Sequence, residues 1–347
     1  MAWQRGGVKL EWIHPAEDER TLHEWFAIWR ATDLEKFPDE TGWDEQDIRS
    51  MALVSEALVH RFLLAREDDG IAIAAGFLVL PVRDNLHAAW ADLRVTASHR
   101  RQGIGRAVLD EIVGAVTGEN RRVINHVSDM PIGQEATHPS RPFVEAMGFV
   151  PSHAGHRRSL HLPLDPAHLG ALNADIAGAP GAQDYRMITL RGPWPDEFVE
   201  DQCALERAMS TDQPLGDEEG EEEAWDAARI GESDRLWAGQ GLTSVVAAAQ
   251  HIESGRLVAY TRMAVSDRRP TEAWQWATIV LKEHRGHRLG LAVKVANLAH
   301  VLEVMPTVRK VITSNAAVNE PMIAVNDLMG FEIDAVGQFW QKWLVDR

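Results

Sequence analysis

The stretch HRRQGIGRAVL, residues 99–109, decides the fold of this sequence. It follows the apolar run HAAWADLRV at 87–95 and opens a segment whose apolar residues recur at helical spacing. A strand that passes through a glycine turn into a helix leaves unpaired backbone N–H groups at the helix start, where the positive end of the helix dipole also lies. Such a turn is suited to an anion, and best to a phosphate or pyrophosphate.

A near copy of this stretch, HRGHRLGLAVK, occupies residues 284–294. Two further anchors follow each copy in the same order. They are RRVI at 121–124 and RKVI at 309–312, and then AMGF at 146–149 and LMGF at 328–331. Three ordered anchors in both halves predict a tandem duplication.

The length of 347 residues fits two domains of ordinary size. A segment rich in Pro, Gly, Ala and Asp separates the two copies and marks a boundary. The sequence therefore predicts an N-terminal domain over 1–165, a linker over 166–184 and a C-terminal domain over 185–347.

Composition excludes several classes of function. The formal net charge of −17 argues against a nucleic-acid partner, because a duplex binder needs a basic surface. No signal peptide and no membrane span are evident, so we expect a cytoplasmic protein with no membrane partner. The single cysteine, Cys203, excludes a disulfide framework. The scattered histidines lack the spacing of metal ligands, and we expect no metal.

Much of the negative charge is local. Residues 212–234 hold ten acidic side chains and one basic one, Arg229. One interpretation is a solvated loop, and the other is a field that attracts a cationic substrate.

Two familiar phosphate motifs fail on specific residues. A P-loop needs Lys-Ser/Thr after its last glycine, whereas Gly105 is followed by Arg106 and Ala107. A dinucleotide fingerprint needs a third small residue, and none stands at its position.

Each half instead resembles the GCN5-related N-acetyltransferase (GNAT) family, whose coenzyme A signature is Gln/Arg-x-x-Gly-x-Gly/Ala at a helix start. Residues 100–105 match it throughout, and residues 285–290 match it except for Arg288 at the first glycine. The chain is similar in layout to two-domain actinobacterial members such as mycothiol synthase. The resemblance implies an α/β fold of two tandem acetyltransferase domains, each with a mixed central sheet splayed between two strands, and acetyl-CoA as the donor.

The resemblance also implies the residues that hold the cofactor. The strand before each turn offers main-chain groups to pantetheine, and a bulge there supplies an N–H to the thioester carbonyl. The turns take the pyrophosphate. The implied cofactor-binding residues are Leu93, Arg94, Val95, Arg100, Arg101, Gln102, Gly103, Ile104, Gly105, Arg106, Thr278, Ile279, Val280, Arg285, Gly286, His287, Arg288, Leu289, Gly290, Leu291, Asn315 and Asn319. For Asn319 a helix N-cap is an equal interpretation.

Direct attack of an amine on the thioester needs a base and a proton donor to the thiolate. The donor of the family is a Tyr four residues before the Gly-Phe pair, and Val144 and Asn326 stand there instead. Because Asn326 can donate an N–H, the resemblance favours the C-terminal domain as catalytic. Glu272 is the candidate base, with a solvated strand-end carboxylate as its alternative; Asp92 lies on the corresponding strand of the first copy.

The resemblance thus predicts an acetyl-CoA-dependent N-acetyltransferase that acts on a small cationic amine, as a monomer or homodimer. In this interpretation the acidic run 217–223 borders the acceptor cleft. The missing Tyr leaves open a non-catalytic acyl-CoA-binding regulator or scaffold. Another acyl donor or a hydroxyl acceptor is a further alternative.

Overall fold

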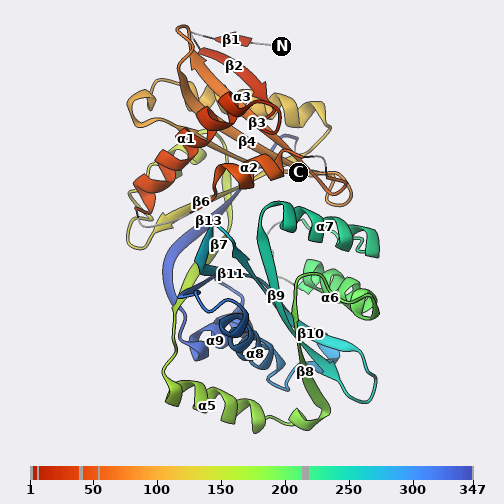
Figure 1. Ribbon diagram of the computed structural model, residues 1–347. Helices are drawn as coiled ribbons and strands as arrows, with labels where there is room; N and C mark the ends of the chain where they lie inside the picture. Colours follow the sequence, from red (N-terminus) through yellow and green to blue (C-terminus); the bar gives the residue numbers. More distant parts are fainter. Residues whose placement is uncertain (1–2, 6–7, 39–41, 54, 213–218, 346–347) are drawn as a thin grey trace. The chain divides into compact units, whose positions relative to one another are not determined.

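The computed structural model of the protein describes residues 3–5, 8–38, 42–53, 55–212 and 219–345, and Figure 1 labels its elements. The chain forms two compact units. Unit 1 comprises Met1–His153 and Gly337–Arg347, and unit 2 comprises Ala154–Val336.

These units differ from the predicted division of the sequence, because each takes in the last strand of the other repeat. Most of strand β7 (Val150–His161), which ends the first repeat, belongs to unit 2. Most of strand β13 (Glu332–Trp343), which ends the second repeat, belongs to unit 1. The predicted linker contains helix α5 (Pro166–Ala177).

The sheet of unit 1 is mixed. Its strands lie in the order β1 (Trp3–Arg5), β2 (Val8–Ile13), β3 (Leu58–Glu67), β4 (Ala72–Pro81), β5 (Ala88–Val95), β6 (Val123–Pro131) and β13. Strands β1 to β5 pair antiparallel, whereas β5 and β6 pair parallel. The parallel pairing runs from Ala88↔Val123 to Trp90↔Asn125, and the two strands continue beyond it.

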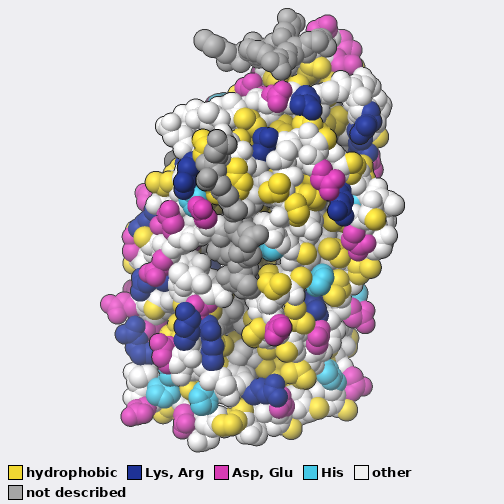
Figure 2. Space-filling model, turned by 180° about the vertical axis from the view of Figure 1, so that it is seen from behind, with side chains coloured by type: hydrophobic (Ala, Val, Ile, Leu, Met, Phe, Trp, Pro, Cys, Tyr) yellow, Lys and Arg dark blue, Asp and Glu magenta, His cyan; other side chains and the backbone are white. Residues whose placement is uncertain are grey.

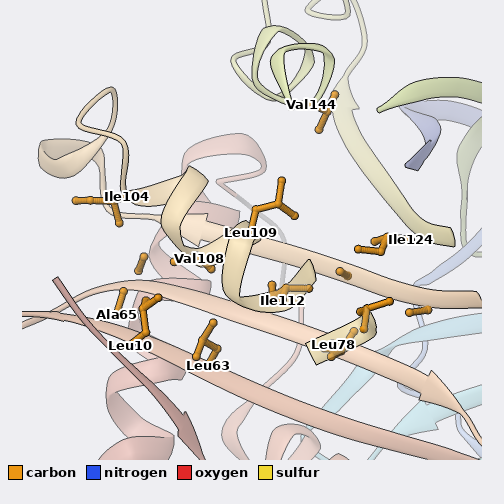
Figure 3. Close-up of a cluster of buried hydrophobic side chains, with 14 of the residues drawn as sticks. Leu10, Leu63, Ala65, Leu78, Ile104, Val108, Leu109, Ile112, Ile124 and Val144 are labelled. Carbon is orange, nitrogen blue, oxygen red and sulfur yellow. The ribbon is translucent and has the colours of Figure 1, made fainter. Parts of the chain in front are cut away.

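Helices cover both faces of this sheet. Helices α1 (Glu19–Lys36) and α2 (Glu45–Met51) pack an aromatic cluster against one face. Helix α3 (Ile104–Gly118) covers the other face, and the short helix α4 (Ser140–Ala146) adds Val144 to the same core. Figure 3 shows the buried side of α3 against the strands. Its buried residues recur at helical spacing, which is why this segment is a helix in this position.

Unit 2 repeats the plan. Its strand order is β8 (Tyr185–Arg191), β9 (Leu242–His251), β10 (Leu257–Ser266), β11 (Arg269–Val280), β12 (Lys310–Ala316) and β7. Helices α5, α8 (Leu289–Val304) and α9 (Glu320–Met329) pack on one face. Helix α6 (Val199–Asp212) packs on the other, and α7 (Ala227–Gly239) contacts β9. The predicted α/β fold of two repeated domains is confirmed.

On the face that Figure 2 displays, acidic and basic side chains are interspersed. In the part of the chain that the structure describes, no helix is both long and apolar enough to cross a lipid bilayer.

Candidate functional site

The two glycine turns have the same backbone. In the first turn Arg101 and Gly103 have positive φ values of 64° and 85°. At the corresponding positions of the second turn Gly286 and Arg288 have values of 88° and 58°. Each turn therefore holds one arginine in the left-handed region that disfavours side chains. Arg288 thus preserves the turn at the cost of local strain.

Replacing Arg288 with Gly should relieve that strain. We expect Arg288→Gly to raise the free energy of unfolding by about 1 kcal/mol in urea denaturation. Gly286→Ala is the matched control. A Cβ there meets open space, so its cost, again about 1 kcal/mol, reports backbone strain alone. A less stable Arg288→Gly protein would contradict this account.

One arginine fastens each turn to the preceding strand. Arg100 donates from Nε to the carbonyl oxygen of Val95, and Arg285 does the same to Val280, both at 3.0 Å. Arg100 also contacts Glu35, with its Nη2 2.6 Å from Oε2. Val95 and Val280 belong to the strand segments whose main-chain groups were expected to bind pantetheine, and their carbonyls are engaged within the turns instead.

The second turn is engaged further by the segment around α5. Arg288 lies 3.4 Å from the carboxylate of Asp175, measured from Nε to Oδ2. His287 donates from Nδ1 to the carbonyl oxygen of Pro180 at 2.6 Å. In the first turn, by contrast, Arg101 and Arg106 have no ionic partner among the residues that the structure describes. The first turn is thus the one whose cations remain available to an anion.

A cavity of about 600 Å³ lies beside the first turn, within the usual size of a ligand pocket. Its walls come from the turn, from β5 after Trp90, from β6 after Asn125, and from α1 and α4. The cavity therefore opens where β5 and β6 cease to pair. The predicted cofactor residues that line it are Leu93, Arg94, Val95, Arg100, Arg101, Gly103, Gly105 and Arg106.

The remaining predicted residues of the first copy lie elsewhere. Gln102 donates its amide to the carbonyl of Ser98 at 3.0 Å, and Ile104 is buried in the core. In the second copy Ile279, Leu289 and Leu291 are core residues.

One wall of the cavity is charged. Asp92 is ion-paired with Arg94, whose guanidinium also lies 4.4 Å from the centre of the Trp29 ring. Burial raises the pKa of Asp92, but the opposing effects of Arg94, His126 and Lys36 bring the pKa below its ordinary value. Asp92 is therefore ionised at neutral pH.

The apolar side of the cavity includes Leu109, Val127 and Val144. The repeat places Lys294, Asn315 and Asn326 at the corresponding positions of unit 2.

These three unit 2 residues bond to one another. Lys294 donates from Nζ to Oδ1 of Asn326 at 2.5 Å, and Asn326 donates from Nδ2 to Oδ1 of Asn315 at 3.2 Å. Lys294 and Asn326 are both 0 % exposed. Unit 2 therefore has a buried polar chain where unit 1 has apolar cavity wall. One N–H of the Asn326 amide, the group predicted to serve a thiolate, is engaged by Asn315.

Burial, with a smaller contribution from Arg158, lowers the pKa of Lys294 to about 7. Between pH 7 and about 10.4, the ordinary lysine value, the unfolded chain binds a proton that the folded chain does not. The free energy of unfolding should therefore rise with pH in that window. Relative to Lys294→Met, the unaltered protein should gain about 2 kcal/mol between pH 7.5 and 9.5.

Denaturant titrations at a series of pH values measure this difference. Lys9→Met, at an exposed position, is the control and should run parallel to the unaltered protein. If Lys294→Met also runs parallel, Lys294 is charged in the folded protein and the buried chain is misassigned.

The predicted base, Glu272, lies near the start of β11 opposite Lys310. The strand bulges four residues later: Arg262 pairs with Ala277 and Met263 with Gln275, which leaves Trp276 unpaired. At about 3.3 Å per residue the bulge is roughly 13 Å from Glu272. The contacts that the structure gives Asn326 do not include Glu272, so the two predicted catalytic residues are not brought together.

The bulge prediction needs correction in both copies. In the second copy it precedes the expected residues Thr278–Val280. In the first copy β5 keeps an uninterrupted register against β4, from Val79↔Trp90 to Ala74↔Val95. Leu93 accordingly has its N–H engaged by Oδ1 of Asp92 at 2.7 Å.

Asn319 is the N-cap of α9, where its Oδ1 accepts from the N–H of Met322 at 3.3 Å. In the acidic run, Asp217 and Glu218 lie outside the described residues. Glu223 lies 3.1 Å from Arg229 and accepts from the Trp225 indole at 2.9 Å. That end of the run is therefore engaged locally.

The residues that the sequence did not single out are His126 and Ser128 in the first cavity and Lys294 in the core of unit 2. His126 is a single histidine on a strand, a pattern without a functional signal. Lys294 did carry one, because it stands at the position of Leu109 on the apolar side of a helix.

Comparison with known proteins agrees with this geometry. Residues 59–151 match the acetyltransferase (GNAT) domain family. No curated protein matches the chain. Among solved structures, a tandem GNAT protein from the clavulanic acid biosynthesis pathway is 28 % identical, with a TM-score of 0.77; the match covers 97 % of this chain and 99 % of that one.

A GCN5-related N-acetyltransferase from Sphaerobacter thermophilus is 12 % identical, with a TM-score of 0.63, over 99 % of this chain and 98 % of that one. At that identity the match concerns the fold alone. Both structures are nonetheless matched along nearly their whole length, so the likeness extends over both repeats.

Proposed function

Since the chain belongs to the GNAT acetyltransferases and consists of two tandem GNAT domains, we propose that it transfers an acetyl group from acetyl-CoA to a small amine, with the acetyl-CoA bound in unit 1. The observation that carries this proposal is the cavity between the first glycine turn and the separated ends of β5 and β6.

The residues present fit such a ligand. The N-terminus of α3, with Arg101 and Arg106 beside it, suits the pyrophosphate. Leu109, Val127 and Val144 give an apolar wall for the arm that follows. When bound, acetyl-CoA supplies an activated acyl carbon and a thiolate leaving group.

The sequence favoured the C-terminal domain as the catalytic one, and the side chains support the other assignment. The second turn is contacted by Asp175 and Pro180, and the positions equivalent to the cavity wall hold a buried polar chain. A ligand that entered this region would have to displace the Asn326 side chain. Lys294 would then be buried without its hydrogen-bond partner, which costs free energy.

A matched pair of glycine variants tests which turn binds the donor. A Cβ on Gly105 would lie 3.1 Å from the Phe143 ring, whereas one on Gly290 would lie 3.8 Å from its nearest neighbour. Gly105→Ala should therefore disturb the cavity and weaken acetyl-CoA binding roughly tenfold, from about 1.4 kcal/mol of overpacking. Gly290→Ala should leave it unchanged.

Isothermal titration calorimetry measures both affinities and should give one acetyl-CoA per chain. Weakening by Gly290→Ala alone would assign the donor to unit 2 instead.

Turnover is tested by thiol release from acetyl-CoA with a panel of small mono- and polyamines, together with the mass of the product. We expect thiol release that depends on the amine and a product heavier than the amine by one acetyl group. Tight binding of acetyl-CoA with no release across the panel would instead support the non-catalytic acyl-CoA-binding alternative.

A further inference from the structure

We propose that His126, acting through the hydroxyl of Ser128, is the general base of the unit 1 site. This assignment rests on the proposed function. Both side chains line the cavity, on the stretch of β6 that has separated from β5.

The hydrogen bonds of His126 define its tautomer. Nδ1 lies 3.0 Å from the carbonyl oxygen of Ala91, which can only accept, so Nδ1 carries the proton. In the neutral ring Nε2 is then an acceptor. It lies 3.0 Å from Oγ of Ser128, whose hydroxyl must therefore donate to it. The lone pair that a base needs is already directed at a hydroxyl in the cavity wall.

The surroundings keep the ring neutral. Burial is the largest effect and brings the pKa of His126 below its ordinary value, although Asp92 and Asp129 oppose it and Arg94 reinforces it. The Oδ1 atom of Asp92 is 3.8 Å from Nδ1, and the Phe149 ring stands across the imidazole with its centre 6.2 Å away. Lys36 on α1 acts on Asp92 rather than on the ring. At neutral pH the His126 ring is therefore neutral, with Nε2 as a hydrogen-bond acceptor.

Asp92 is the obvious competitor and is the weaker base. Its carboxylate accepts from the N–H of Leu93 and pairs with Arg94, and its pKa lies below the ordinary value. The role of Asp92 in the proposed reaction is electrostatic. Its carboxylate, 3.8 Å from Nδ1 of His126, stabilises the imidazolium that forms when His126 takes a proton.

The proton path balances. Ser128 Oγ takes the proton that the acceptor nitrogen loses as it bonds to the acetyl carbon, and the proton of the hydroxyl passes to Nε2 of His126. The electron pair of the broken carbon–sulfur bond leaves on sulfur. His126 then returns its proton to that thiolate, and both side chains regain their starting state.

The first test needs no ligand. Nitrogen-15 NMR of the histidines in the ligand-free protein should show His126 protonated on Nδ1 and bare on Nε2, titrating below the ordinary histidine value. Asp92→Asn should move that titration to still lower pH, because the carboxylate raises the pKa of His126. A ring protonated on Nε2 at neutral pH would overturn the assignment.

The second test is the pH profile of kcat/KM. In the unaltered protein an acid limb should follow the protonation of His126. His126→Gln should remove that limb and lower kcat/KM on the order of a hundredfold at pH 7.5, with the Kd for acetyl-CoA within about threefold. Ser128→Ala should lower kcat while keeping the limb, since His126 remains.

His153→Gln is the matched control. His153 is another histidine of unit 1 whose pKa burial lowers, and its ring stacks on Phe339 at 4.0 Å rather than lining the cavity. The His153→Gln protein should therefore retain the full pH profile of kcat/KM.

The outcomes separate the two proposals. An active protein whose profile and rate survive His126→Gln overturns the base and leaves the acetyltransferase standing. A protein that binds acetyl-CoA and releases no thiol with any amine overturns both.

Discussion

The pairing between β5 and β6 is the constraint on which unit 1 depends. Three residues of each strand bond in parallel register, from Ala88↔Val123 to Trp90↔Asn125, and then the strands part. Their separated ends leave backbone and side chains that a closed sheet would have covered. The glycine turn stands at the end of one of them, so an anion site and an apolar slot form side by side. The position of His126 and Ser128 on the other separated end follows from the same geometry.

The two repeats differ in the side chains that stand at the apolar wall of the first cavity. Their turns share a backbone, and an arginine fastens each turn to its strand in the same way. The difference lies in three positions, where Leu109, Val127 and Val144 correspond to Lys294, Asn315 and Asn326. A buried lysine is tolerated because an amide accepts from it and because burial lowers its pKa to about 7, which makes the neutral form accessible near neutral pH.

Much of the fold could be predicted from local sequence. Helix α8 begins at Leu289 and ends at Val304, as its apolar spacing indicates, and the turn at 100–105 is where the glycines place it. The candidate site was harder to predict from the sequence. A comparison position by position identified Asn326 as a donor, but its hydrogen bonds depend on Lys294, 32 residues away on another helix. The cavity could not be predicted from the sequence either, because residues of α1 and α4, which are distant in the chain, form part of its walls.

The exchange of β7 and β13 was not foreseeable either, since a strand has the same pattern whichever sheet it joins. Its consequence reaches beyond the site. If the chain were divided at the segment between the repeats, each fragment would lack the last strand of its own sheet, which the other fragment carries. The strand next to it would then be an exposed edge. Neither repeat therefore completes its own sheet. The second repeat therefore supplies a strand to the sheet of the first, whether or not it binds a cofactor itself.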